Sequence, residues 1–110
     1  MQVKDIIHHL DLTVYTGDNN LNNEVTGGYC SDLLSDVIGN AERNMVWITM
    51  QYHKNIVAVA ALKEVAAIII VNNHKPDNEV IEASRNEGIP LLSTSFPAFE
   101  VAGKIYQLLR

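Results

Sequence analysis

Ala67-Ile68-Ile69-Ile70-Val71 carries the clearest fold signal in the sequence. All five residues are apolar and four of them are β-branched. A strand with one face in water alternates apolar and polar residues, whereas a strand covered on both faces is apolar throughout. Fully covered strands are typical of parallel sheets packed between two layers of helices. The run therefore predicts an α/β protein.

Strand and helix patterns alternate on both sides of this run. Upstream, Val46-Trp47-Ile48-Thr49 is a predicted strand, and the alanine-rich segment from Asn55 to about Val65 favours a helix with Asn55 as its cap. Downstream, Asp77 is expected to open a helix that stops at Gly88, and residues 90–93 form a short strand. Ser95 is expected to cap a final helix.

The first forty residues continue the alternation. Apolar residues at 3, 6, 7 and 10 share one helix face, residues 12–15 favour a strand, and residues 25–30 form an extended segment after the polar loop 16–23. A helix from about Leu33 can end at Gly39-Asn40. Short strand–helix–strand connections imply right-handed crossovers. We expect residues 1–110 to form one three-layer-like α/β domain with a mainly parallel sheet and flanking helices.

The charge balance argues against two classes of partner. The chain of 110 residues carries 8 Lys plus Arg against 13 Asp plus Glu, for a net charge of −5. This composition predicts neither nucleic-acid binding nor attraction to an anionic membrane surface. The chain start lacks a signal-peptide pattern, and the longest apolar runs are shorter than the about 20 residues that span a bilayer. With a single cysteine, Cys30, we expect a cytoplasmic protein.

Polar residues follow each predicted parallel strand. In such sheets ligands bind beyond the carboxyl ends of the strands, and these groups would share that edge. They offer hydroxyl, amide and imidazole groups suited to a small anionic or nucleotide-like ligand. The residues are Thr49, His53, Asn72, His74, Ser93, Thr94 and Ser95. The alternative is that they are ordinary loop polarity and helix caps.

Catalytic and metal-binding patterns do not stand out. His53 and His74 follow different strands, but no nucleophile, carboxylate pair or set of metal ligands accompanies them at a recognisable spacing. Neither a phosphate-binding P-loop nor a dinucleotide-binding glycine motif is present. Cys30 is expected to be a buried, inert thiol on a core-facing strand, and Phe96 and Phe99 are expected in the core or an interface. We expect no enzyme, no metal and no cofactor that the sequence requires, although a nucleotide remains open.

Glu24-Val25-Thr26-Gly27-Gly28 is the most distinctive motif. Its two glycines allow either an anion-binding turn of backbone N–H groups or simply a tight turn. The pentad resembles the signature of the DRTGG domain family, with Thr26, Gly27 and Gly28 identical and Glu24 keeping the acidic character. The resemblance extends over nearly the whole chain, through the segments 28–37, 46–49, 53–60 and 88–94.

The resemblance implies a compact α/β domain of a family whose members are regarded as regulatory or ligand-binding modules that tend to pair. It also implies similarity to the N-terminal, non-catalytic domain of HPr kinase/phosphorylase. The family's Arg is Val25 here. If that Arg recognises phosphate in other members, this chain has lost a bidentate contact that Val cannot replace. Val25 would instead add apolar surface for a contact between chains.

These observations predict a non-catalytic regulatory or ligand-binding module that acts as a homodimer. The pentad and the adjoining loop of residues 17–23 would form part of the interface or site. The alternatives are a sensor of nucleotides or phosphorylated metabolites, and an accessory subunit of a phosphotransferase or redox complex.

Overall fold

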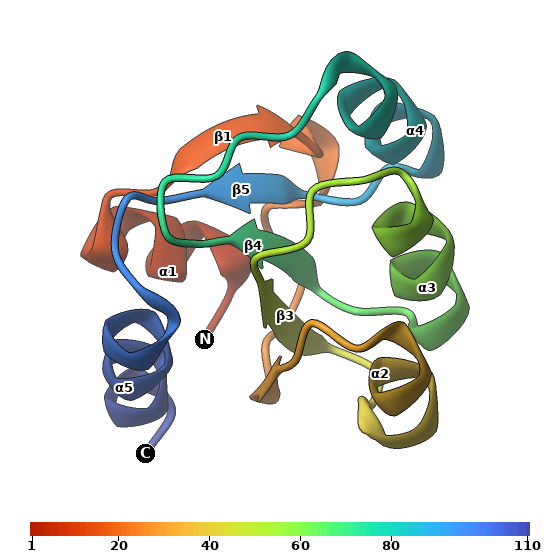
Figure 1. The fold of residues 1–110 in the computed structure, drawn as a ribbon. Helices are drawn as coiled ribbons and strands as arrows, with labels where there is room; N and C mark the ends of the chain where they lie inside the picture. The colour runs from red at the N-terminus through yellow and green to blue at the C-terminus, as the bar shows by residue number, and fades with distance from the viewer.

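A five-stranded sheet with the order β1-β5-β4-β3-β2 forms the centre of the molecule (Figure 1). The strands are β1 (Thr13–Thr16), β2 (Gly27–Cys30), β3 (Met45–Thr49), β4 (Ala67–Ile70) and β5 (Leu91–Ser93). Strands β2 to β5 run parallel, and β1 pairs antiparallel with β5. The computed structural model, which describes residues 1–110, thus confirms the predicted α/β class and mainly parallel sheet.

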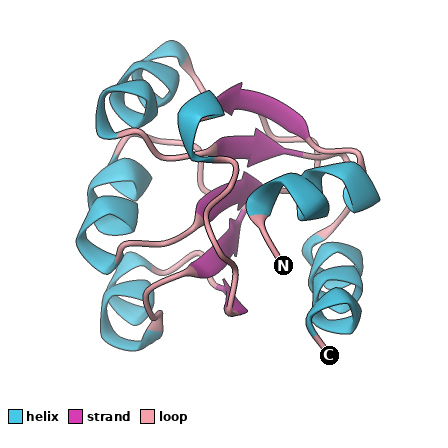
Figure 2. Cartoon of the chain, turned by 180° about the vertical axis from the view of Figure 1, so that it is seen from behind, coloured by secondary structure: helices cyan, strands magenta, loops and turns pink.

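Helices cover both faces of this sheet. They are α1 (Val3–Leu10), α2 (Leu34–Asn40), α3 (Asn55–Lys63), α4 (Asn78–Glu87) and α5 (Ala98–Leu109), with a short 3₁₀ helix, η1 (Asp18–Asn20). Figures 1 and 2 show α1 and α5 on one face and α2, α3 and α4 on the other. None of the helices is long and apolar enough to cross a membrane.

The fully apolar strand β4 explains the three layers. Ala67 and Ile69 pack in the cluster that contains the buried residues of α1 and α5, whereas Ile68 and Ile70 pack in the cluster beneath α2, α3 and α4. Each of these four side chains is 0% exposed. Alternate residues of one strand therefore fill two separate cores. Trp47 is buried in the second cluster.

Most helix boundaries agree with the sequence signals, and two caps do not. The Asp77 side chain accepts a hydrogen bond from the backbone N–H of Val80, and Gly88 ends α4 in a left-handed conformation. Ser95 does not cap α5, because the helix begins only at Ala98, after Pro97. Proline suits a position just before a helix because its ring restricts φ and it has no N–H to satisfy. Asn55 is the first residue of α3 rather than its cap.

The polar loop before β2 packs along the amino-terminal ends of β4 and β5. Gly17 has a φ of +88°, and a Cβ there would lie 2.4 Å from Cα of Pro90. The Asn20 side-chain amide donates to the carbonyl of Gly88, and that of Asn23 donates to the carbonyl of Ala66 at 3.3 Å. The loop residues are therefore fixed by contacts within the domain.

Candidate binding groove beside strand β2

Strand β2 is an edge strand with a groove beside it. Its only strand partner is β3, and its other edge has none. Between β2 and α5 lies a groove of about 680 Å³ whose walls include Gly27, Gly28 and Cys30 from the strand and Phe99, Gly103 and Tyr106 from the helix. We call this the β2–α5 groove. It contains the two glycines of the pentad, which leave room because they carry no side chain.

The helix wall of the groove is unusually exposed. Phe99 is 89% exposed and Tyr106 is 68% exposed, whereas Val101 and Ile105 on the inner face of α5 are buried. Phe99, Gly103 and Tyr106 are spaced by four and three residues, so they form one stripe on the outer side of the helix. The prediction that Phe99 lies in the core is wrong, and its alternative, an interface, stays a prediction.

A charged group lies at the end of this aromatic stripe. The Arg110 guanidinium, which also lines the groove, lies 5.9 Å from the ring centroid of Tyr106. Outside the groove, the Lys104 ammonium lies 4.5 Å from the ring centroid of Phe96. Both distances are in the range of cation–π interactions. The groove therefore combines an apolar floor with aromatic walls and a polar rim, an arrangement that suits noncovalent binding.

Cys30 lies in the groove and is exposed, so the prediction of a buried thiol is wrong. The residue does face α5, but the helix and the glycines beside it leave the strand partly uncovered. Partial burial, together with the negative charge of Asp32, raises the pKa of the Cys30 thiol above its usual value. A raised pKa lowers the fraction of reactive thiolate at neutral pH.

The prediction that Val25 adds apolar surface for a contact between chains is wrong. Its side chain is 4% exposed and belongs to the core cluster shared with Val3 and Ile6 of α1. Glu24 is exposed and forms an ion pair of 3.6 Å with the N-terminal amine. Thr26 is exposed, and its N–H donates to the carbonyl of Asn44 at 3.0 Å. Only Thr26, Gly27 and Gly28 of the pentad line the groove.

The carboxyl edge of the sheet holds the second group of predicted residues. Two of its hydroxyl groups have partners inside the domain. Thr49 is 2% exposed and donates to the Asp32 carboxylate at 2.8 Å, and the same oxygen accepts from the Met50 N–H at 2.7 Å. Ser93 is 7% exposed and lies 3.4 Å from the hydroxyl of Tyr15. These hydroxyls hold the strand ends together.

An aromatic group stands at the same edge. The Tyr52 and His74 rings are stacked, with centroids 5.5 Å apart and an interplanar angle of 13°. The His53 ring lies 4.7 Å from the Tyr52 ring, so both histidines contact the same tyrosine.

The loop between these rings and α5 is fixed by its backbone. Asn72 is exposed and has a φ of +63°, and its N–H donates to the carbonyl of Phe96 at 2.8 Å. The carbonyl of Thr94 accepts from the Asn73 N–H at 3.0 Å. Ser95 is exposed on the adjoining turn.

The two predicted groups do not form one site. The glycines of the pentad begin β2, near the amino ends of the parallel strands, whereas Thr49 and the rings follow the carboxyl ends. Strand β2 has four residues, which corresponds to about 13 Å at about 3.3 Å per residue. The pentad therefore belongs to the β2–α5 groove, and the polar loops form a separate surface.

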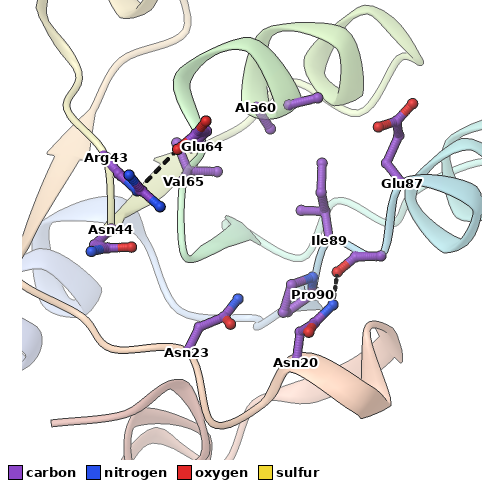
Figure 3. Close-up of a pocket in the computed structure, with 12 residues that line it drawn as sticks. Asn20, Asn23, Arg43, Asn44, Ala60, Glu64, Val65, Glu87, Ile89 and Pro90 are labelled. Atoms are coloured by element: carbon purple, nitrogen blue, oxygen red, sulfur yellow. Dashed lines mark hydrogen bonds and ion pairs between the residues drawn. The ribbon is translucent and has the colours of Figure 1, made fainter.

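A second concavity, of about 320 Å³, lies at the amino-terminal edge of the sheet (Figure 3). Asn20, Asn44, Glu64 and Glu87 are among its lining residues, and Arg43 pairs with Glu64 at 2.9 Å. Its residues come from four distant segments, and only Asn20 and Asn23 belong to the loop 17–23 that was predicted as part of an interface or site. Its ion pair is largely exposed, with Arg43 at 76% and Glu64 at 60%. Exposed pairs of this kind contribute little energy.

Asp36 and Tyr29 link α2 to the edge strand. The Tyr29 hydroxyl donates to both carboxylate oxygens of Asp36, at 2.9 and 2.8 Å. Hydrogen bonds from the hydroxyls of Ser31 and Tyr29 lower the pKa of the Asp36 carboxyl.

No group of three or more His, Cys, Asp or Glu side chains is arranged to hold a metal ion.

The DRTGG domain model matches residues 5–108. The chain belongs to the DRTGG domain family. This DRTGG domain is also similar to a solved structure of the CBS and DRTGG domains of the regulatory region of Clostridium perfringens pyrophosphatase, complexed with its activator, diadenosine tetraphosphate. The similarity has a TM-score of 0.79 at 16% identity and covers 96% of this chain and 46% of that one. The DRTGG domain thus spans about half of the chain it resembles. No curated protein matches the sequence significantly.

Proposed function

We propose that this DRTGG domain is a non-catalytic regulatory or ligand-binding module that acts as a homodimer in the cytoplasm. The β2–α5 groove carries the proposal, because it places the glycines of the family motif beside two exposed aromatic side chains. Large apolar patches on soluble proteins commonly mark interaction sites. The similar pyrophosphatase structure is described as a regulatory region, which supports the same kind of role here. The exposed free thiol of Cys30 suits a reducing compartment.

Native mass spectrometry of the protein purified without added ligand tests this proposal. We expect a dimer, with a defined extra mass if the purified module retains a small molecule. A monomer at all accessible concentrations, with no ligand bound, would contradict the proposal. A stable complex with a different protein would favour the alternative role of an accessory subunit of a phosphotransferase or redox complex.

A nucleotide sensor is the second candidate function, and the stacked Tyr52 and His74 rings favour it. Aromatic rings provide stacking surfaces for bases, and Lys54 and Lys75 are exposed on the same loops to meet phosphate. The similar regulatory region is complexed with a dinucleotide, diadenosine tetraphosphate. In this alternative the ligand lies at the carboxyl edge of the sheet rather than in the groove.

Thermal-shift measurements with AMP, ADP, ATP, diadenosine tetraphosphate and acetyl phosphate test the sensor function. A ligand at 100 times its Kd should stabilise the domain by about 2.7 kcal/mol. Tyr52→Ala should abolish that shift, whereas Phe99→Ala, which changes the β2–α5 groove, should preserve it. A flat response to all five compounds would argue against the sensor.

A further inference from the structure

We infer that the homodimer forms through the β2–α5 groove, with two α5 helices packed antiparallel across a two-fold axis near Ala102 and Gly103. The inference rests on the proposed homodimer and specifies its surface. In this arrangement Phe99 of each copy meets Tyr106 of the other, and the small residues between them allow the helices to approach closely.

The spacing along α5 makes the surface self-complementary. Phe99 and Tyr106 are seven residues apart, and the midpoint between them falls at Ala102–Gly103. A two-fold axis through that midpoint exchanges the two aromatic positions, so each ring is placed against the other kind. Contacts of this type close on themselves because both copies use the same patch.

The exposed area is large enough to matter for a dimer. At roughly 200 Å² for a fully exposed aromatic side chain, the exposed fractions of Phe99 and Tyr106 leave about 300 Å² in water. A stable interface buries about 800 Å² on each partner. Two side chains would therefore supply more than a third of the required area, and the groove floor and rim would supply the rest.

Gly103 supports a close approach from outside the domain. It lies in the middle of α5, where glycine is less favourable than alanine by roughly 0.5–1 kcal/mol. Nothing in the domain lies within 4 Å of a Cβ placed there, so packing inside the chain does not require glycine. A second helix on this face would use the space.

The charges at the two ends of α5 fit the antiparallel arrangement. Glu100 lies beside Phe99 near the start of the helix, and Arg110 lies over Tyr106 at its end. When Phe99 of one copy meets Tyr106 of the other, Glu100 and Arg110 of opposite copies approach one another. A parallel arrangement would bring like charges together instead.

Edge strand β2 adds a second reason for covering this side. Natural edge strands are commonly protected by charged residues or proline. Gly27-Gly28-Tyr29-Cys30 contains neither. A small ligand in the groove would leave the outward-facing Phe99 in water, whereas a second copy covers the ring and screens the strand.

The test compares two glycine-to-glutamine variants by sedimentation equilibrium. Gly103→Gln places a long polar side chain on the proposed axis. Gly39→Gln is the matched control, because Gly39 also lies in a helix, α2, with nothing within 4 Å of an added Cβ. Glutamine favours helix over glycine, so both variants should fold at least as stably as the parent chain.

We expect Gly103→Gln to raise the dimer Kd at least 100-fold and Gly39→Gln to change it less than threefold. A dimeric parent chain whose Kd is the same with Gly103→Gln would overturn this interface and leave the homodimer intact. A parent chain that stays monomeric would overturn both. Circular dichroism confirms that each variant is folded before its Kd is compared.

Discussion

Restoring the family arginine at position 25 tests how the motif works in this chain. Val25 is 4% exposed and packs with Val3 and Ile6. Val25→Arg removes a buried side chain worth about 1.5 kcal/mol. It also forces the guanidinium either into the core without a partner or outward at the cost of local rearrangement, which adds a further few kcal/mol. We expect a total loss of about 3–5 kcal/mol.

Thermal unfolding followed by circular dichroism measures this loss. For a domain of about 100 residues, 1 kcal/mol lowers Tm by roughly 4 °C, so Val25→Arg should lower it by about 12–20 °C. Asn22→Arg is the control, because Asn22 is exposed in the same segment. If the two variants melt within about 2 °C of each other, position 25 admits a charged side chain and burial of Val25 does not contribute the expected free energy.

Three further predictions concern the fold and the groove. Gly17→Ala should destabilise the domain by more than about 2 kcal/mol in urea unfolding, because an added Cβ strains a φ of +88° and clashes with Pro90. Gly39→Ala, with no such contact, should stabilise the domain by about 0.5–1 kcal/mol, and equal effects of the two variants would show that position 17 does not require glycine. Because the pKa of Asp36 is lowered in the folded protein, its carboxylate stabilises the fold above the unfolded-state pKa of about 3.9, and this stabilisation is lost as the pH falls through the folded-state pKa. Asp36→Asn should therefore flatten the dependence of the free energy of unfolding on pH at acid pH, and an unchanged dependence would show that Asp36 does not stabilise the fold. Iodoacetamide should alkylate Cys30 at pH 8 more slowly than a free cysteine peptide even in dilute protein, because its pKa is raised, and an equal rate would show an unperturbed thiol.

The order of strands and helices could be predicted because its signals are local. The apolar run of β4, the Asp77 cap and the Gly88 stop each depend on a few neighbouring residues, and each is confirmed. The prediction that Ser95 caps α5 is wrong. Serine is a common capping residue, but Ser95 lies in the loop before the helix. Pro97 sets the true start of α5.

The groove could not be predicted because it depends on which side of α5 faces the sheet. The helix carries two apolar stripes, one with Phe99 and Tyr106 and one with Val101 and Ile105. Periodicity alone does not tell which stripe is buried. Packing on the sheet buries the second stripe, so the aromatic one remains in water. The exposure of Cys30 follows from the same choice.

The carboxyl edge was predicted as a place where polar groups meet, and the parallel strands do bring those loops to one edge. What the sequence could not indicate is how many of the groups are already engaged. Thr49 bonds to Asp32 across 17 positions of sequence, a contact without any local signature. The stacking of Tyr52 on His74 is equally nonlocal.

Hydrogen–deuterium exchange measured at high and low protein concentration reports directly whether a second copy covers the β2–α5 groove. If a second copy covers the β2–α5 groove, the backbone amides of residues 27–30 and the outer side of α5 should exchange more slowly at high concentration, while those of α3 stay unchanged. If exchange at residues 27–30 and in α5 does not depend on concentration, across the range in which the protein is a dimer, this groove is not the dimer interface.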